Sequence, residues 1–174
     1  MTASAPVPWS TRAERPQDVT VIRDITLAAF PGPEEADLVD ALRADPEAWV
    51  ARLSRVTVDA HDRPVAHALL TRCTVGGDRA LALAPCSVLP EFQRQGAGRA
   101  AIRAALDAAR VQGENLVVVL GHADYYPRFG FTPASAAGVT APFEVPDDAF
   151  LVLALDPGRT VPRGEVAYPA AFGV

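Results

Sequence analysis

Two glycines, Gly96 and Gly98, separate an apolar segment from an amphipathic one and have the spacing that best indicates chemistry in this 174-residue chain. After Gly98, apolar residues recur at helical spacing as far as Ala109, and arginines occupy the opposite face. The first N–H groups of a helix lack intrahelical partners and lie at the positive end of its dipole, so they bind anions. The pattern Gln93-x-x-Gly96-x-Gly98 therefore predicts a phosphate-binding helix start, where glycines let the anion approach closely.

This spacing differs from two common phosphate-binding motifs. It lacks the Gly-Lys-Ser/Thr ending with which a Walker loop reaches a terminal phosphate and magnesium, and it is not the Gly-x-Gly-x-x-Gly of a dinucleotide fold. A second motif follows after one predicted helix and one apolar strand. Residues 120–131 read Leu-Gly-His-Ala-Asp-Tyr-Tyr-Pro-Arg-Phe-Gly-Phe.

The two motifs, in this order, resemble the GNAT superfamily of acyl-CoA-dependent N-acetyltransferases. That family has a pyrophosphate loop of the form Gln/Arg-x-x-Gly-x-Gly/Ala, and its cofactor-binding half ends in Tyr-x-x-x-Gly-Phe, here Tyr126 to Phe131. The sequence around Tyr126 resembles that of a bacterial branch of predicted N-acetyltransferases. The resemblance implies one α/β domain over residues 1–174, with a mixed sheet of about six or seven strands and flanking helices.

The resemblance also implies where acetyl-CoA binds. In the family, the strand before the glycine loop bulges and separates from its neighbour, and the pantetheine arm pairs with the free edge. Pro85 removes a donor from the strand ladder and suits such a bulge. The implied acetyl-CoA-binding residues are Val88, Gln93, Arg94, Gln95, Gly96, Ala97, Gly98 and Arg99.

The implied reaction is direct transfer of the acetyl group to a primary amine in a ternary complex. Tyr126 lies four residues before Gly130, where the family often carries a tyrosine that protonates the departing thiolate. A backbone N–H near Val88 would polarise the thioester carbonyl. An acyl-cysteine route through Cys86 is an alternative, although the sequence shows no activating partner for that thiol.

The general base is less well defined, because the predicted strand over 80–89 carries no acidic residue. An ammonium group must lose a proton before it attacks a thioester. Glu34 and Asp124 are the predicted proton acceptors, with Glu35, His122 or a water chain as alternatives. We expect the amine to enter opposite the CoA arm, between the second helix and the loop that carries His122 and Asp124. The same residues could instead serve as helix-start charges or caps. The missing strand carboxylate leaves open a second function, an inactive acyl-CoA-binding or sensing module.

Composition and charge restrict the partners. The net charge is −5 and most arginines are dispersed, which argues against nucleic acid. No apolar run approaches the roughly 18 residues of a membrane span, and the N-terminus lacks a signal-peptide pattern, so we expect a cytoplasmic protein without a membrane partner. The expected acceptor is a small-molecule amine or a peptide amino group, and the expected state is a monomer or homodimer. The histidines show no metal-ligand spacing, so no metal is expected.

Periodicity and turn signals locate the elements that must position these residues. We expect a helix capped by Asp18 that ends before Pro31, a second helix over 34–43, and a third that ends at Gly113. The stretch 134–148 has the composition of a long loop. The strand after the third helix should lie parallel to the strand before it, through a right-handed crossover. The expected strands cover residues 7–12, 50–59, 64–75, 80–89, 115–120, 150–155 and 164–168.

Overall fold

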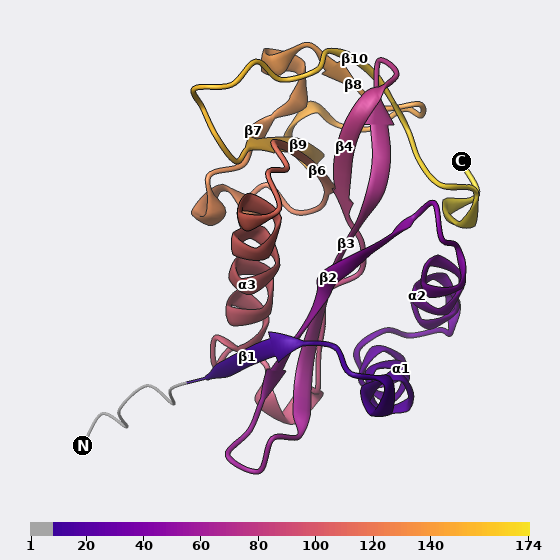
Figure 1. Cartoon of the computed structure of the whole chain (residues 1–174), viewed down its shortest axis with the longest axis vertical. Coiled ribbons are helices and arrows are strands. Elements are labelled where there is room, and N and C mark those ends of the chain that lie inside the picture. Colours follow the sequence, from indigo (N-terminus) through magenta and orange to yellow (C-terminus); the bar gives the residue numbers. More distant parts are fainter. Residues whose placement is uncertain (1–8) are drawn as a thin grey trace.

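A computed structural model describes residues 9–174 of the chain, and Figure 1 shows a twisted sheet with helices packed on its faces. The helices are α1 (Val19–Ala29), α2 (Glu34–Ala44) and α3 (Ala97–Val111). The longer strands are β1 (Ser10–Ala13), β2 (Trp49–Val58), β3 (Pro64–Val75), β4 (Asp78–Leu83), β6 (Leu116–Leu120), β9 (Phe150–Ala154) and β10 (Gly164–Ala167). Three two-residue strands are β5 (Ser87–Val88), β7 (Thr132–Pro133) and β8 (Val139–Thr140).

The main path through the sheet runs β1-β2-β3-β4-β6-β9-β7, and β5 and β10 both pair with β3. β4 and β6 are parallel and are joined through α3, so the predicted crossover is confirmed. The α/β fold class with a mixed sheet is also confirmed. The described part of the sheet has ten strands rather than the six or seven expected, because the two-residue strands carry no periodicity that a sequence could reveal.

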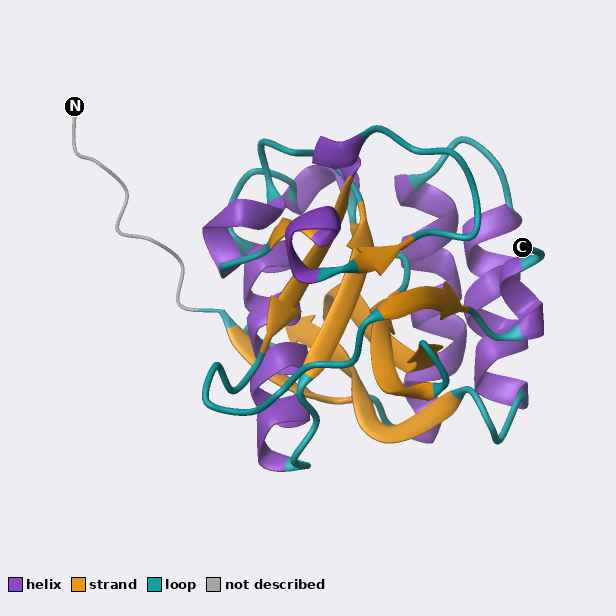
Figure 2. Cartoon of the chain, turned by 90° about the horizontal axis from the view of Figure 1, so that it is seen from above, coloured by secondary structure: helices purple, strands orange, loops and turns teal. Residues whose placement is uncertain are grey.

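The helices cover opposite faces of the sheet. Figures 1 and 2 show α3 on one face and the α1–α2 pair on the other. The buried face of α3 packs its small and branched residues, such as Ala101 and Ile102, against β2 and β3, in a core cluster that also includes residues of β4 and β6. On the opposite face, Ile22 of α1 and Leu42 of α2 pack against β2 and β3. The sheet therefore separates α1 and α2 from α3.

Of the strand expected over 7–12, residues 7 and 8 lie outside the described part of the chain, and the described strand is β1 from Ser10 to Ala13. Two other expectations about the elements need correction. The strand expected over 80–89 breaks after Leu83. The stretch 134–148 is not a simple loop, since it contains β8, which pairs in parallel with β10, and two 3-10 turns. Long-range pairing, which local composition does not encode, decides each case.

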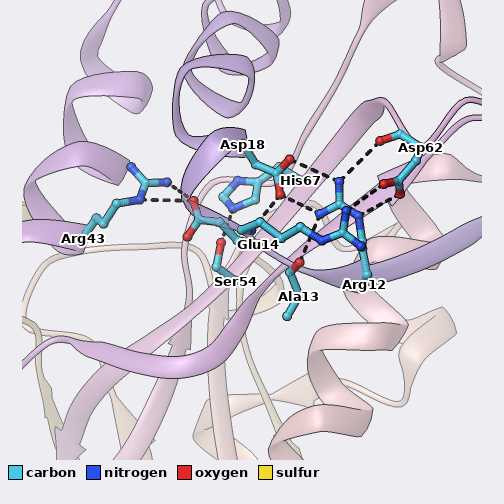
Figure 3. A network of polar contacts seen from close by, with 9 residues as sticks. Arg12, Ala13, Glu14, Asp18, Arg43, Ser54, Asp62 and His67 are labelled. Atoms are coloured by element: carbon cyan, nitrogen blue, oxygen red, sulfur yellow. Dashed lines mark hydrogen bonds and ion pairs between the residues drawn. The ribbon is translucent and has the colours of Figure 1, made fainter.

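Asp18 precedes α1 as expected but does not cap it with its side chain. Its buried carboxylate instead accepts a hydrogen bond from the Arg15 backbone N–H at 2.7 Å and pairs with Arg12 Nη1 at 2.6 Å, a network drawn in Figure 3. Burial opposes ionisation, but the hydrogen bonds from Arg12 and Arg15 outweigh it and lower the pKa of Asp18. This network anchors the segment between β1 and α1.

His67 lies on β3 in the same region and is completely buried. Its Nε2 lies 2.8 Å from Ser54 Oγ, and Figure 3 shows the ring beside the pair formed by Glu14 and Arg43. Burial, with the charge of Arg43 as a second cause, lowers the pKa of His67 to about 3. The ring is therefore neutral near neutral pH and serves as a structural residue.

Replacing His67 by glutamine should flatten the dependence of the free energy of unfolding on pH. The pKa of His67 is about 3 in the folded protein and about 6.5 when unfolded, so between these values only the unfolded chain binds the proton. Stability should fall as pH falls through this window, by about 2 kcal/mol at about pH 5. Urea titrations of the wild type and H67Q near pH 7 and pH 5 measure the difference, in which the unchanged carboxylates cancel. Equal pH slopes in the two proteins would contradict this assignment.

Candidate active site

A one-residue register shift separates β4 from β5 along their common partner β3. Leu83 pairs with Leu70 and Ser87 pairs with His67, so three residues (84–86) face two residues of β3 (68 and 69). This count defines a β-bulge. Pro85 lies within it and has no N–H to donate, so the bulge predicted from Pro85 is confirmed.

The bulge leaves one side of β5 without a neighbouring strand. β4 pairs with β6 only at Leu81 and Ala82, and in the described residues β5 pairs only with β3. The Leu89 N–H donates to the Val65 carbonyl at 2.9 Å. Because hydrogen-bonded and non-bonded pairs alternate in an antiparallel ladder, the N–H and C=O of Val88 point away from β3. The Val88 carbonyl accepts a hydrogen bond from Gln93 Nε2 at 3.3 Å.

The loop after β5 ends in a left-handed residue that starts α3. Gly96 is the N-cap with φ of +86°, a conformation that a residue with a Cβ adopts only under strain, and within residues 9–174 no side chain caps the helix. Two bonds from distant segments hold the loop in place. Trp9 Nε1 donates to the Gln95 carbonyl at 2.7 Å, and Thr57 Oγ1 donates to the Ala97 carbonyl at 2.8 Å.

A pocket of about 470 Å³ opens where α3 begins, within the size range of small-molecule sites. It is lined by Val88, Phe92, Gln93, Arg94, Gly96, Ala97, Gly98, Arg99, Tyr125 and Arg128. The structure thus brings together all of the sequence-predicted cofactor residues except Gln95. The Gln95 side chain instead donates to the Glu91 carbonyl at 3.0 Å, so it shapes the loop.

Gly98 has a different role from the one expected from the sequence. It is buried, and a Cβ at this position would lie 2.9 Å from Val88 Cγ2. The glycine therefore allows α3 to pack closely on β5, beside the pocket that it lines, and its contact with an anion stays a prediction. At Gly96 only Trp9 lies near the position of a Cβ, at 3.9 Å, so the reason for glycine there is its backbone conformation.

The second motif forms a 3-10 turn, η3 (Tyr126–Phe129), with Tyr125 as its N-cap. The two adjacent tyrosines, Tyr125 and Tyr126, face different surroundings. The Tyr126 ring covers Gly121 so closely that a Cβ on Gly121 would overlap it. The Tyr125 hydroxyl lies 3.9 Å from the position of a Cβ on Gly98, at the pocket. The Arg128 guanidinium stacks on Tyr125, 4.4 Å from the ring centroid, and Arg128 Nε donates to the Tyr125 carbonyl at 2.8 Å.

Burial keeps the proton on the titratable groups of this junction. Burial, followed by the proximity of Cys86 and Tyr125, raises the pKa of Tyr126. Burial raises the pKa of Cys86 to about 12. Tyr125 also has a raised pKa, mainly because of burial. All three groups are therefore neutral hydrogen-bond donors near neutral pH.

The two predicted proton acceptors do not line this pocket. Glu34 is the first residue of α2 and is exposed, and its carboxylate folds over Gly32. Asp124 is exposed in the loop before η3, where its carbonyl accepts a hydrogen bond from Arg128 Nη2 at 3.4 Å. α2 packs against α1, β2 and the C-terminal turn η6 (Ala170–Phe172). The predicted amine entrance between Glu34 and Asp124 stays a prediction.

Four residues of this site were missed by sequence reasoning. Phe92, Tyr125 and Arg128 join the pocket, and Gly121 makes room for the Tyr126 ring. All but Phe92 lie in the second motif, so a signal existed, but only the fold shows which side chain faces the helix start. Within residues 9–174, no group of three His, Cys, Asp or Glu side chains could hold a metal ion. The helices of the same part of the chain are too short or too polar to span a membrane.

Comparisons with known proteins agree with this geometry. The Acetyltransferase (GNAT) family model matches residues 19–131. The uncharacterized N-acetyltransferase YjhQ of Escherichia coli K12 is 38% identical over 136 residues, 75% of this chain and 74% of that protein. A GNAT family acetyltransferase from Brucella melitensis, crystallised with acetyl-CoA, is 34% identical with a TM-score of 0.76 over 95% of this chain and 98% of the relative. The E. coli GNAT family N-acetyltransferase YhbS, crystallised with CoA, is 25% identical with a TM-score of 0.87 over 100% and 97%.

The loop at the start of α3, the bulge before it and these matches lead to one assignment. The family model covers more than half of the chain, and the relatives of known structure align over nearly all of it. The protein belongs to the GNAT family of N-acetyltransferases.

Proposed function

We propose that this enzyme transfers the acetyl group of acetyl-CoA directly to a primary amine, of a small molecule or of a peptide, while both substrates are bound. The observation that carries the proposal is the bulge at Pro85, which leaves the outward-facing N–H of Val88 without a neighbouring strand, beside the pocket at the start of α3. This arrangement offers hydrogen-bond donors to a phosphate group and to a thioester carbonyl on adjoining backbone segments.

The start of α3 supplies the donors for the pyrophosphate. The backbone N–H groups of residues 97–99 belong to the first turn, where no intrahelical acceptor exists. Arg94 and Arg99 line the same pocket, and within residues 9–174 neither side chain has a hydrogen bond or ion pair. Gln93 holds the loop to the Val88 carbonyl and so fixes these donors relative to β5.

The transfer needs one bond to form and one to break. The amine nitrogen attacks the thioester carbon, the Val88 N–H donates to the carbonyl oxygen as charge develops there, and the C–S bond then breaks. The Tyr126 hydroxyl gives its proton to the departing thiolate. A phenol of ordinary pKa near 10 is a weaker acid than a thiol near 8.5, so this step depends on the environment of the sulfur.

The thiol of Cys86 shows how burial near Tyr126 affects the pKa of a sulfur group. Burial raises its pKa to about 12 beside Tyr126, and in this proposal the CoA sulfur leaves into the same buried region. Burial would then raise the pKa of the departing thiol as well as that of Tyr126, which makes the proton transfer less unfavourable than the ordinary pKa values imply. The high pKa also keeps Cys86 protonated and a poor nucleophile, which favours direct transfer over an acyl-cysteine intermediate.

The proton lost by the amine goes to a carboxylate on the acceptor side in this proposal. Glu34 and Asp124 are exposed and carry the charge that would attract an ammonium group. Glu34 lies at the start of α2, and Asp124 lies two residues before Tyr126. Either one, or a water that it holds, would accept the proton before attack.

An amine panel tests this function. Free CoA thiol should be released from acetyl-CoA only when an accepted amine is present, and initial rates with both substrates varied should give intersecting lines, as a ternary complex requires. In the same assay, E34Q and D124N should raise the KM for the amine and leave the KM for acetyl-CoA unchanged. Parallel lines, or thiol release that never depends on an amine, would contradict direct transfer.

Gly96→Ala should weaken acetyl-CoA binding, because a Cβ disfavours the left-handed conformation that aims the first N–H groups of α3. Gly113→Ala is the matched control: Gly113 also has positive φ, of +78°, with nothing near its Cβ position, and it follows the other end of the same helix. Each variant should lose about 1 kcal/mol of stability. Only G96A should show a Kd for acetyl-CoA raised about tenfold or more by calorimetry. Equal affinities in G96A and G113A would refute the loop assignment.

Tyr126→Phe should lower kcat by about 100-fold and change the Kd for acetyl-CoA little, since it removes only the proton donor. Tyr125→Phe removes the same atom one residue earlier. Because the Tyr125 hydroxyl lies at the pocket, Y125F should alter the Kd for acetyl-CoA and leave kcat within about threefold. Steady-state kinetics and calorimetry separate the two effects. The register assignment fails if the two variants lose kcat equally, or if Y126F loses none.

A further inference from the structure

One arginine occupies a core-facing position of β2. Successive residues of a strand point to opposite faces of a sheet, so Arg55 shares its face with Leu53 and Thr57. Both of these neighbours are completely buried: Leu53 belongs to the core cluster that contains the buried face of α3, and Thr57 Oγ1 donates to the Ala97 carbonyl. Arg55 therefore lies on the side of the sheet that α3 covers.

The charge of Arg55 has no counterion in the described structure. Within residues 9–174 its side chain makes no hydrogen bond or ion pair, and its Nε is buried without a partner. Burial lowers the pKa of Arg55, and no nearby acid acts in the opposite direction. Buried polar groups in native proteins nearly always have a partner, so an unpaired donor beside a cavity indicates a bound water or ion.

A pocket of about 400 Å³ opens beside Arg55, between α3 and the strands β1 and β2. It is lined by Thr11, Arg52, Arg55, Ala104, Asp107, Ala108, Val111 and Gln112. Ala104 and Ala108 are neighbours on one face of α3, and their side chains are too short to fill the space. The pocket shares no lining residue with the cofactor pocket, which opens beside η3. It is therefore a separate site.

A bulge in β2 brings a second arginine to the same pocket. Residues 50–53 lie opposite a single residue of β3, Leu70, and Arg52 within the bulge has φ of +70°. That left-handed conformation is strained for a residue with a Cβ, and such strain concentrates at functional sites, including ligand clamps. Gln112, the C-cap residue of α3, holds the bulge by donating from Nε2 to the Ala51 carbonyl at 2.8 Å. Within residues 9–174, the Arg52 side chain also has no hydrogen bond or ion pair.

The single carboxylate that lines the pocket does not neutralise these arginines. Asp107 is exposed, and its Oδ1 lies 2.8 Å from Nη1 of Arg110, three residues further along α3. The pocket thus carries two uncompensated guanidinium groups in a chain with a net charge of −5. Guanidinium forks bind the oxygens of phosphate and carboxylate groups through paired hydrogen bonds. Two such forks match the charge of a dianion.

We propose that this pocket between α3 and β2 binds a small dianion through Arg52 and Arg55. The ligand class is a phosphate monoester or a dicarboxylate, since either offers about two negative charges near neutral pH. The apolar side chains of Ala104, Ala108 and Val111 contact the carbon atoms of the ligand. The site goes beyond the proposed acetyl transfer, because the cofactor and the dianion use different residues and bind at the same time.

Calorimetry with saturating acetyl-CoA tests this site, because an occupied cofactor pocket cannot bind the probe. The probes are inorganic phosphate and succinate, in a buffer without other polyvalent anions. The wild-type enzyme should bind at least one of them, and the tighter probe identifies the class, phosphate for a monoester and succinate for a dicarboxylate. Arg55→Met removes the charge and keeps the apolar stem, so R55M should fold and bind the tighter probe about tenfold or more weakly. R52Q should weaken the same binding.

Arg163→Met provides the matched control, because it removes the same charge from an exposed residue that lines neither pocket. R163M should bind the probe as the wild type does. D107N should bind it at least as tightly, since this change removes a like charge from the pocket.

Thermal unfolding gives a second readout. Without a probe, R55M should melt no lower than the wild type, because it removes an uncompensated charge. The tighter probe should raise the Tm of the wild type and of R163M but not that of R55M. The site is overturned if neither probe binds the wild type, or if R55M and R163M bind equally. It is also overturned if D107N weakens binding, or if R55M melts well below the wild type without a probe, since Arg55 would then pair with an acid of the protein itself.

Discussion

The site depends on the one-residue register shift between β4 and β5 along β3. Without the extra residue, the strand would continue straight beside β6, and its main-chain groups would be occupied by ladder bonds. The bulge keeps β5 paired with β3 but takes it out of reach of β6. A strand held on one side and open on the other can pair its backbone with a ligand, as an added strand would. Pro85 makes this break local, because it cannot contribute an N–H to the ladder.

A second constraint fixes the helix start relative to that open strand. The absence of a side chain at Gly98 allows α3 to begin directly against Val88, and Thr57 holds the first residue of the helix from β2. The start of α3 and the outward-facing N–H of Val88 are therefore parts of one close-packed junction. Because interiors are close-packed, a small increase in volume at Gly98 would move the helix start relative to the strand. Positioning here depends on packing as much as on hydrogen bonds.

The junction also separates two electrostatic environments within one short segment of the chain. Cys86 and Tyr126 lie on the buried side, where their raised pKa values keep them neutral. The arginines of α3 lie on the exposed side, where water stabilises their charge until an anion replaces it. The same helix thus divides a weakly polar region suited to thioester chemistry from a positive surface suited to phosphates. Gly121 contributes to this division, because it allows the Tyr126 ring to pack flat on the backbone.

The sequence by itself determined features that depend on neighbouring residues: the helical periodicity of α3, its end at Gly113, its glycine start at Gly96, and the break that Pro85 introduces. Each has a local physical cause, namely side-chain spacing, positive φ or a missing N–H. The tertiary structure alone decided which distant segments meet. It placed Arg128 beside the start of α3, made Gly98 a packing residue and gave the two-residue strands their partners. Such contacts arise from long-range pairing and close packing, which leave no periodic signal in the segments that form them.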